Sequence, residues 1–154
     1  VYYPPEFYAA YFTVKVADFK DAVILKGPDA ILARIAEVEA KGKSATAKEN
    51  DEVTVLEVAY EMYARGYEFL PARLGKSKAK KFMAEDGKVR LPFLALEGVG
   101  ETVSEAIACE YDLCPYETVE EISLRSKASK TVVETLRNHG VLDGMQETDQ
   151  ISMF

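Results

Sequence analysis

One glycine-containing turn constrains the fold of this 154-residue chain more than any other stretch. Gly98-Val99-Gly100 follows a short apolar run and precedes a segment with apolar residues at helical spacing: Val103, Ala106 and Ile107. Two glycines around one apolar residue let the backbone turn tightly and approach a partner closely, because neither carries a Cβ. The pattern predicts two packed helices that meet at a tight turn.

The same turn is a candidate phosphate site. The amides that open a helix have no acceptor within it, and they carry the positive end of the helix dipole. An anion can therefore bind there. A helix, a G-x-G turn and a second helix resemble the helix-hairpin-helix, a module that binds a DNA phosphate through backbone N–H groups. For this triplet alone, a tight turn without a ligand remains the alternative.

A second helical pair follows, because residues 118–140 repeat the plan of residues 93–111. Thr118 with Glu121 predicts a capping box, and Ser129 predicts the cap of the next helix. The turn between these helices is basic instead of glycine-rich, with three cations: Arg125, Lys127 and Lys130. We expect phosphate contacts at both turns: Gly98, Val99 and Gly100 in the first, and Lys127, Ser129 and Lys130 in the second.

Charge is distributed unevenly along the chain. The net charge of −7 argues against a generic nucleic-acid binder. Residues 73–90, however, carry seven basic and two acidic side chains, and this strip immediately precedes the glycine turn. Four of its lysines are candidate contacts to a DNA backbone: Lys76, Lys78, Lys80 and Lys81. A solvated face or a protected strand edge is the alternative.

Composition excludes several classes of protein. Hydrophobic content of 48% with 29% charged residues is typical of a soluble globular chain, and no apolar run is long enough to span a membrane. Cys109, Cys114 and His139 are too few for a zinc site of the usual kind. We expect reduced thiols in a cytoplasmic protein, Cys109 packed on its helix, no metal site and no catalytic residue. The chain opens without Met or a signal peptide, so we expect it to be the cut end of a longer protein.

The N-terminal part predicts helices and one hairpin. An aromatic group is expected in the core: Phe7, Tyr8, Tyr11 and Phe12. Gly27-Pro28-Asp29 predicts a helix start, with Gly42 as its end. A second helix is expected from beyond Asn50 to about Arg65. Asp86-Gly87 between two short runs predicts a β-hairpin.

The last five residues form a candidate peptide for binding a partner. They end in three large apolar side chains that suit insertion into an apolar pocket: Gln150, Ile151, Ser152, Met153 and Phe154.

Several stretches together resemble one family closely. They are YYPPEFYAAYFTV, GPDAILARIAEVEAKG, TVLEVAYEMYARGYEF, LPFLALEGVGETVSEAI, SKASKTVVETLRNHGVLDGM and QISMF, and the resemblance covers essentially the whole chain. The sequence is similar to the C-terminal region of the PolC-type DNA polymerase III α subunit, the replicative polymerase of low-GC Gram-positive bacteria. The resemblance implies four parts: the end of a fingers region (1–72), a basic β-hairpin connector (73–92), a tandem helix-hairpin-helix domain (93–143) and a flexible tail (144–154).

The resemblance also implies partners. QISMF is similar to the pentapeptide QL(S/D)LF that binds the sliding clamp, with Ile151 and Met153 as conservative departures. The implied partners are duplex DNA, the clamp (the beta subunit) and the remainder of the polymerase. Magnesium is the implied cofactor of the parent nucleotidyltransferase, but the metal-binding aspartates of its palm are not in this chain. The stretch Ala108–Leu113 is more acidic than the family pattern, which puts the strength of DNA binding in doubt.

We therefore expect a mainly α chain with a small β-hairpin, in which a helical end of a fingers region precedes a tandem helix-hairpin-helix domain and a flexible tail. Its expected function is to hold duplex DNA without sequence preference and to tether a polymerase to its clamp. The alternative is a non-catalytic adaptor that makes protein contacts only, which the acidic balance favours. A base-excision-type enzyme would need a suitable catalytic Lys or Asp next to the hairpin, and none is present.

Overall fold

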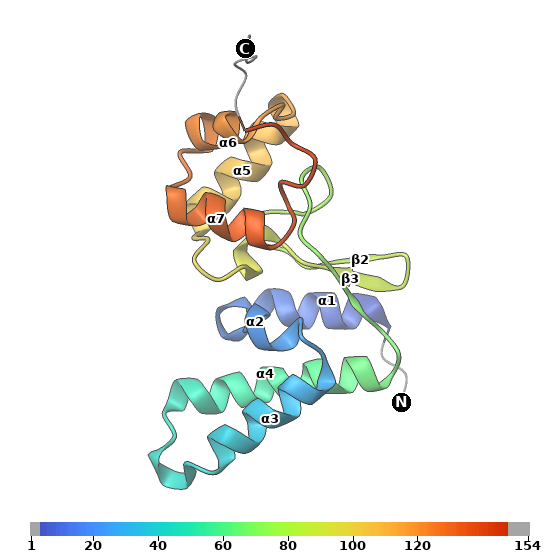
Figure 1. Ribbon diagram of the computed structural model, residues 1–154. Coiled ribbons are helices and arrows are strands. Elements are labelled where there is room, and N and C mark those ends of the chain that lie inside the picture. Colours follow the sequence, from blue (N-terminus) through green and yellow to red (C-terminus); the bar gives the residue numbers. More distant parts are fainter. Residues whose placement is uncertain (1–3, 148–154) are drawn as a thin grey trace. The chain divides into compact units, whose positions relative to one another are not determined.

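The computed structural model describes residues 4–147 and divides them into two compact units (Figure 1). The first unit holds residues 4–70 and 82–90, and the second holds residues 71–81 and 91–147. The segment expected as a connector, residues 73–92, is thus shared between the two units. The prediction of a mainly helical chain with a small β-hairpin is confirmed.

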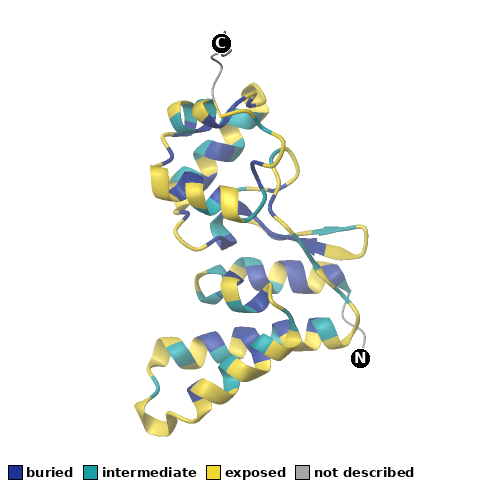
Figure 2. Ribbon diagram, viewed as in Figure 1, coloured by how far each residue is buried: buried dark blue, intermediate teal, exposed yellow. Residues whose placement is uncertain are grey.

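Four α-helices build most of the first unit: α1 (Pro5–Val14), α2 (Asp21–Ile24), α3 (Pro28–Glu39) and α4 (Ala47–Ala64). Pro28 follows Gly27 and opens α3 as predicted. The predicted start of the next helix beyond Asn50 is wrong, because a capping box between Thr46 and Glu49 satisfies the first amides and begins α4 at Ala47. Figure 2 shows that the loop joining α3 to α4 is exposed.

A three-stranded sheet completes the first unit. Its strands are β1 (Phe69–Leu70), β2 (Met83–Glu85) and β3 (Lys88–Arg90), in the order β1-β3-β2. The predicted hairpin is confirmed: β2 and β3 are antiparallel, and both turn residues, Asp86 and Gly87, have positive φ (52° and 77°), as a tight hairpin turn requires. The sequence did not indicate that β1 pairs with β3 in parallel.

Aromatic rings form the core of the first unit. Phe12 is fully buried, and its ring centroid lies 5.5 Å from Phe19, 5.4 Å from Phe69 and 5.7 Å from Phe82. Tyr8 is also fully buried, and burial, with a hydrogen bond to Glu61, raises the pKa of Tyr8 to about 12. The prediction of an aromatic core therefore holds for Tyr8 and Phe12, whereas Phe7 remains 42% exposed and Tyr11 is half-buried.

Three α-helices form the second unit: α5 (Glu101–Leu113), α6 (Val119–Ser126) and α7 (Lys130–Asn138). Each contributes one fully buried apolar residue to the core, namely Ile107, Ile122 and Leu136. The predicted capping box of Thr118 with Glu121 is confirmed, and so is the Ser129 cap of α7. Before α5 the structure has only a 3₁₀ turn, Phe93–Ala95, where the hairpin pattern indicated a first helix.

Residues 71–81 are fixed to this second unit by hydrogen bonds. Ser77 Oγ donates to the carbonyl of Leu91 at 2.7 Å and accepts from the amide of Arg73 at 2.9 Å. The amide of Phe93 donates to the carbonyl of Lys78 at 3.2 Å. The most basic segment of the chain is thus held against the body that carries the glycine turn.

Both cysteines are unpaired thiols on the surface. The expectation that Cys109 packs within the protein is wrong, because α5 buries Ser104 and Ile107 and turns Cys109 toward solvent. None of the helices in residues 4–147 combines the length and hydropathy that crossing a membrane requires.

Candidate nucleic-acid interface

The two hairpin turns of the second unit follow the same backbone path. Gly98 and Lys127, which are 29 positions apart, both have left-handed backbones, with φ of 89° and 60°. The next residue in each turn is apolar and buried: Val99 is 4% exposed and Ala128 is 6% exposed. The small apolar residue anchors each turn, so the helix that follows starts in a fixed position.

The equivalence continues into the residue that precedes each second helix. Gly100 has φ −77° and ψ 171°, and Ser129 has φ −72° and ψ 165°. Each is the N-cap, of α5 and α7 respectively. The expectation of two similar hairpins is therefore met in the turns and in the helices that follow them.

The two glycines of the first turn have different roles. The turn requires a positive φ at Gly98, and residues other than glycine rarely adopt such a backbone conformation. Gly100 has an ordinary extended backbone, and a Cβ built on it would meet nothing within 4 Å. The fold therefore does not require glycine at position 100. What Gly100 provides is bare, exposed backbone at the start of α5, where no side chain caps the free amides.

Carboxylates surround the first turn. Glu101, the first residue of α5, is exposed, and Glu105 lies one turn later. Lys80, an expected DNA contact, does reach this turn, but its Nζ lies 2.9 Å from Glu105 and 3.1 Å from Glu101. These two carboxylates, Glu105 most, raise the pKa of Lys80. Because all three side chains are exposed, the pairs are weak.

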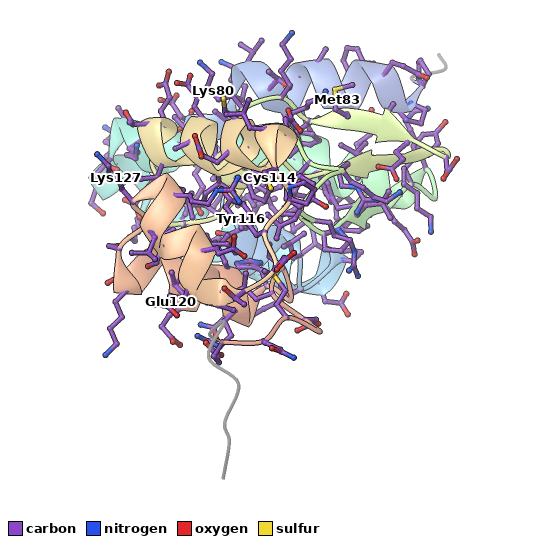
Figure 3. All side chains as sticks on the ribbon, turned by 90° about the horizontal axis from the view of Figure 1, so that it is seen from above. Lys80, Met83, Cys114, Tyr116, Glu120 and Lys127 are labelled. Atoms are coloured by element: carbon purple, nitrogen blue, oxygen red, sulfur yellow. The ribbon has the colours of Figure 1, made fainter. Side chains whose placement is uncertain are left out.

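The second turn is electropositive. Lys127 and Lys130 are exposed, and within residues 4–147 neither forms an ion pair. Lys127 lies at the turn after α6 (Figure 3). Ser129 Oγ accepts from the amide of Val132 at 3.3 Å, so the cap satisfies only part of the first turn of α7. Lys127 precedes the Ser129 cap and Lys130 follows it, so this turn is more favourable for an anion than the first.

Arg125 does not belong to the basic surface. Its guanidinium lies 4.6 Å over the ring of Tyr116 and donates to the carbonyls of Glu110 and Cys114, at the end of α5. Arg125 therefore caps α5, because a cation there satisfies carbonyls that the helix leaves open.

The remaining expected sites lie in two places. Lys76, Lys78 and Lys81 are exposed on the segment 71–81, and among the described residues Lys78 and Lys81 form no ion pair. The candidate clamp peptide, residues 150–154, lies outside the described residues. Within residues 4–147, no group of three or more His, Cys, Asp or Glu side chains is placed to hold a metal ion.

Comparison with known proteins identifies the C-terminal part of the chain. A family model described as a helix-hairpin-helix motif matches residues 66–151, which is more than half of the chain. The match includes both turns and the basic segment before them.

Whole-chain relatives share one description. The chain is 46% identical to DNA polymerase III PolC-type of Clostridium perfringens, 42% identical to that of Thermotoga maritima and 36% identical to that of Listeria monocytogenes. All of this chain is covered in each comparison, but it spans only 11% of the length of these relatives.

Proposed function

We propose that this chain holds duplex DNA without sequence preference. It belongs to the helix-hairpin-helix family and is homologous along its length to a segment of PolC-type DNA polymerase III. The observation that carries the proposal is the matched pair of turns, Gly98–Gly100 and Lys127–Ser129, each of which leads into an exposed helix start. Contacts of this kind reach phosphates and carry no base information, so binding is independent of sequence.

The two turns contribute unequally to this function. At the first, the bare backbone of Gly100 lets a phosphate approach the free amides of α5, while Glu101 opposes the phosphate charge. At the second, Lys127 and Lys130 supply positive charge beside the Ser129 cap. We assign the stronger contact to the second turn and the shorter, backbone-mediated contact to the first.

The resemblance also supports a tether to the sliding clamp. Residues 150–154, QISMF, match the clamp-binding pattern at Gln150, Ser152 and Phe154. In this proposal the chain works inside a cytoplasmic replicative polymerase, whose magnesium-dependent synthesis becomes more processive because one body binds both duplex and clamp. The remainder of the polymerase carries the chemistry.

An adaptor that makes only protein contacts is the second candidate. Glu101 and Glu105 at the first turn, with the net charge of −7, favour it because they repel a phosphate backbone. The two functions differ in whether the chain binds DNA at all.

Duplex binding by charge variants tests the proposal. Fluorescence anisotropy of a labelled duplex should report binding by the chain, and Gly100→Glu and Lys130→Glu should each weaken it because they place a carboxylate at an expected phosphate. Gly100→Glu is preferable to Gly98→Glu, since position 100 accepts a side chain without backbone strain. Lys43→Glu, in an exposed turn of the first unit, is the matched control. No duplex binding by the unmodified chain would support the adaptor, whereas variants that bind like the unmodified chain would contradict phosphate contacts at these turns.

The tether is tested separately by measuring clamp binding. The whole chain should bind a bacterial sliding clamp, and a chain without residues 150–154 should not. Binding that survives the deletion, or no binding by either form, would contradict the role of the tail while leaving the duplex proposal intact.

A further inference from the structure

The second unit has a hollow whose lining includes no residue of either hairpin turn. It measures about 250 Å³, and its wall includes Arg73, Tyr111, Tyr116, Asp143 and Met145. This volume is below the roughly 300–1,000 Å³ of sites for drug-sized ligands. The hollow suits a single planar ring system.

Tyr116 forms a rigid inner wall of this hollow. Its hydroxyl donates to the carbonyl of Ile107 at 3.0 Å, and the guanidinium of Arg125 covers its ring. Burial raises the pKa of Tyr116 to about 12, so the hydroxyl stays protonated and keeps this hydrogen bond. The ring of Tyr111 stands 5.9 Å away at 54° to it. Tyr116 is only 7% exposed and supports the half-buried ring of Tyr111, which is the aromatic ring available at the opening.

The basic segment holds Tyr111 in place. A Cβ on Gly75 would lie only 2.9 Å from Cε1 of Tyr111, so the ring rests directly on the backbone of residue 75. A second, smaller hollow of about 80 Å³ on this ring has Lys76, Ser77, Lys78 and Asp112 among its lining residues. Tyr111 therefore has Arg73 near one hollow and two lysines near the other.

Charge favours a polyanion as the occupant. Residues 71–81 carry five basic side chains and no acidic one: Arg73, Lys76, Lys78, Lys80 and Lys81. Arg73 is exposed, and its side chain forms no ion pair within residues 4–147. Asp143, also exposed, repels phosphate from its own side of the hollow, which leaves Arg73 as the phosphate partner.

The basic segment also joins this hollow to the first hairpin turn. Gly75 contacts Tyr111 near the end of α5, whereas Lys80 contacts Glu101 at its start. Ten residues of helix separate these points, or about 15 Å at 1.5 Å per residue. A B-form strand places one phosphate every 3.4 Å, so the distance corresponds to roughly four nucleotides.

We propose that the hollow beside Tyr111 binds one unpaired nucleotide of a DNA strand whose neighbouring duplex is held at the hairpin turns. The base stacks on Tyr111, and Arg73 contacts the adjoining phosphate. Such stacking platforms beside a cationic track are the usual means of binding single strands without sequence preference. The inference rests on the proposed duplex function, to which it adds a site for the single strand next to the duplex.

The test compares two labelled DNAs with the full chain: a blunt duplex and the same duplex with a six-nucleotide single-stranded overhang. The overhang should tighten binding about fivefold, on the scale of one stacked base. Tyr111→Leu and Arg73→Gln should each remove this advantage and leave blunt-duplex binding unchanged. Tyr111→Phe, which keeps the ring, should retain it.

A spectroscopic readout separates stacking from a general effect on folding. 2-Aminopurine placed in turn at each overhang position should be quenched at one position by the unmodified chain and by Tyr111→Phe, but not by Tyr111→Leu. Equal affinity for both DNAs, or quenching that survives Tyr111→Leu, would overturn the proposal. A peptide would then be the alternative occupant of the hollow. Tyrosine-dependent binding of the overhang strand alone, without duplex binding, would support this site and contradict the duplex function. Binding of neither DNA would overturn both.

Discussion

Lys127 takes the backbone position in the second hairpin that Gly98 takes in the first, with φ of 60° against 89°. A lysine in the left-handed region costs free energy that a glycine does not. Lys127, the residue with this unfavourable conformation, is an exposed cation beside the start of α7, where a positive charge would favour phosphate binding. A strained residue at an exposed, charged position motivates a test of its role in binding.

Lys127→Gly should therefore separate stability from binding. The free energy of unfolding should stay unchanged or rise by up to about 1 kcal/mol as the strain is relieved. Duplex affinity in about 0.1 M salt should fall roughly fivefold with the loss of one phosphate contact. Urea unfolding and fluorescence anisotropy measure the two quantities, and Lys127→Arg, which keeps the charge, is the control. Unchanged affinity in Lys127→Gly would remove Lys127 from the interface.

The two glycines of the first turn should respond in opposite ways to alanine. Gly98→Ala should lower the free energy of unfolding by about 1–2 kcal/mol, because φ of 89° is strained for alanine. Gly100→Ala should leave stability unchanged or raise it by about 0.5 kcal/mol, since its backbone suits any residue. Duplex binding should nevertheless weaken in Gly100→Ala, because the methyl group blocks close approach. Tight binding by a stable Gly100→Ala chain would contradict the backbone contact.

An ion pair in the first unit provides a pH-dependent test. Lys41 and then the amide of Thr46 hydrogen-bond to Glu49 and lower its pKa from 4.5 to about 2. Because the folded pKa lies below the unfolded one, the stabilisation is present above about pH 4.5 and is lost as the pH falls toward 2. Glu49→Gln should show a smaller loss of stability over this range. Thermal unfolding measures the stability of both proteins at each pH. An identical pH dependence of stability in the two would exclude this role for Glu49.

Arg34 is the central cation of the same region. Its Nε lies 2.9 Å from Glu52, whose side chain is 6% exposed. Arg34→Met should lower the free energy of unfolding by about 2–3 kcal/mol, because it strands a nearly buried carboxylate. Glu37→Gln removes only the exposed partner of Arg34, at 64% exposure, and should change stability by less than about 0.5 kcal/mol. Equal effects of the two substitutions would mean that the burial of Glu52 does not determine how much stability is lost in Arg34→Met.

Local signals predicted much of this fold. The Thr118–Glu121 box and the Ser129 cap both form, and the apolar positions Val132, Val133 and Leu136 are buried as their spacing indicated. These features depend on residues three or four positions apart, which a sequence displays directly. Thr46 with Glu49 carried the same signal, so the early start of α4 could have been predicted from it.

Long-range contacts could not be predicted in this way. Residues 73–81 attach to the second unit through Ser77 and Leu91, while the hairpin that follows belongs to the first, and no periodicity marks that boundary. Lys80 was expected to be available to DNA, and its pairing with Glu101, 21 residues away, is visible only in three dimensions. The left-handed backbone of Lys127 is equally hidden, because lysine carries no preference for it.

The salt dependence of duplex binding tests the central claim most directly. Two phosphate contacts, one at each hairpin turn, predict that the logarithm of the binding constant falls with the logarithm of salt at a slope of about −2, so that affinity drops roughly tenfold between 50 and 200 mM salt. Titrations of a labelled duplex of arbitrary sequence, repeated on a second sequence of the same length, measure this slope. Steep and equal dependence for both sequences is the predicted result. Binding that is insensitive to salt, or no binding at the lowest salt, would contradict a phosphate-holding function.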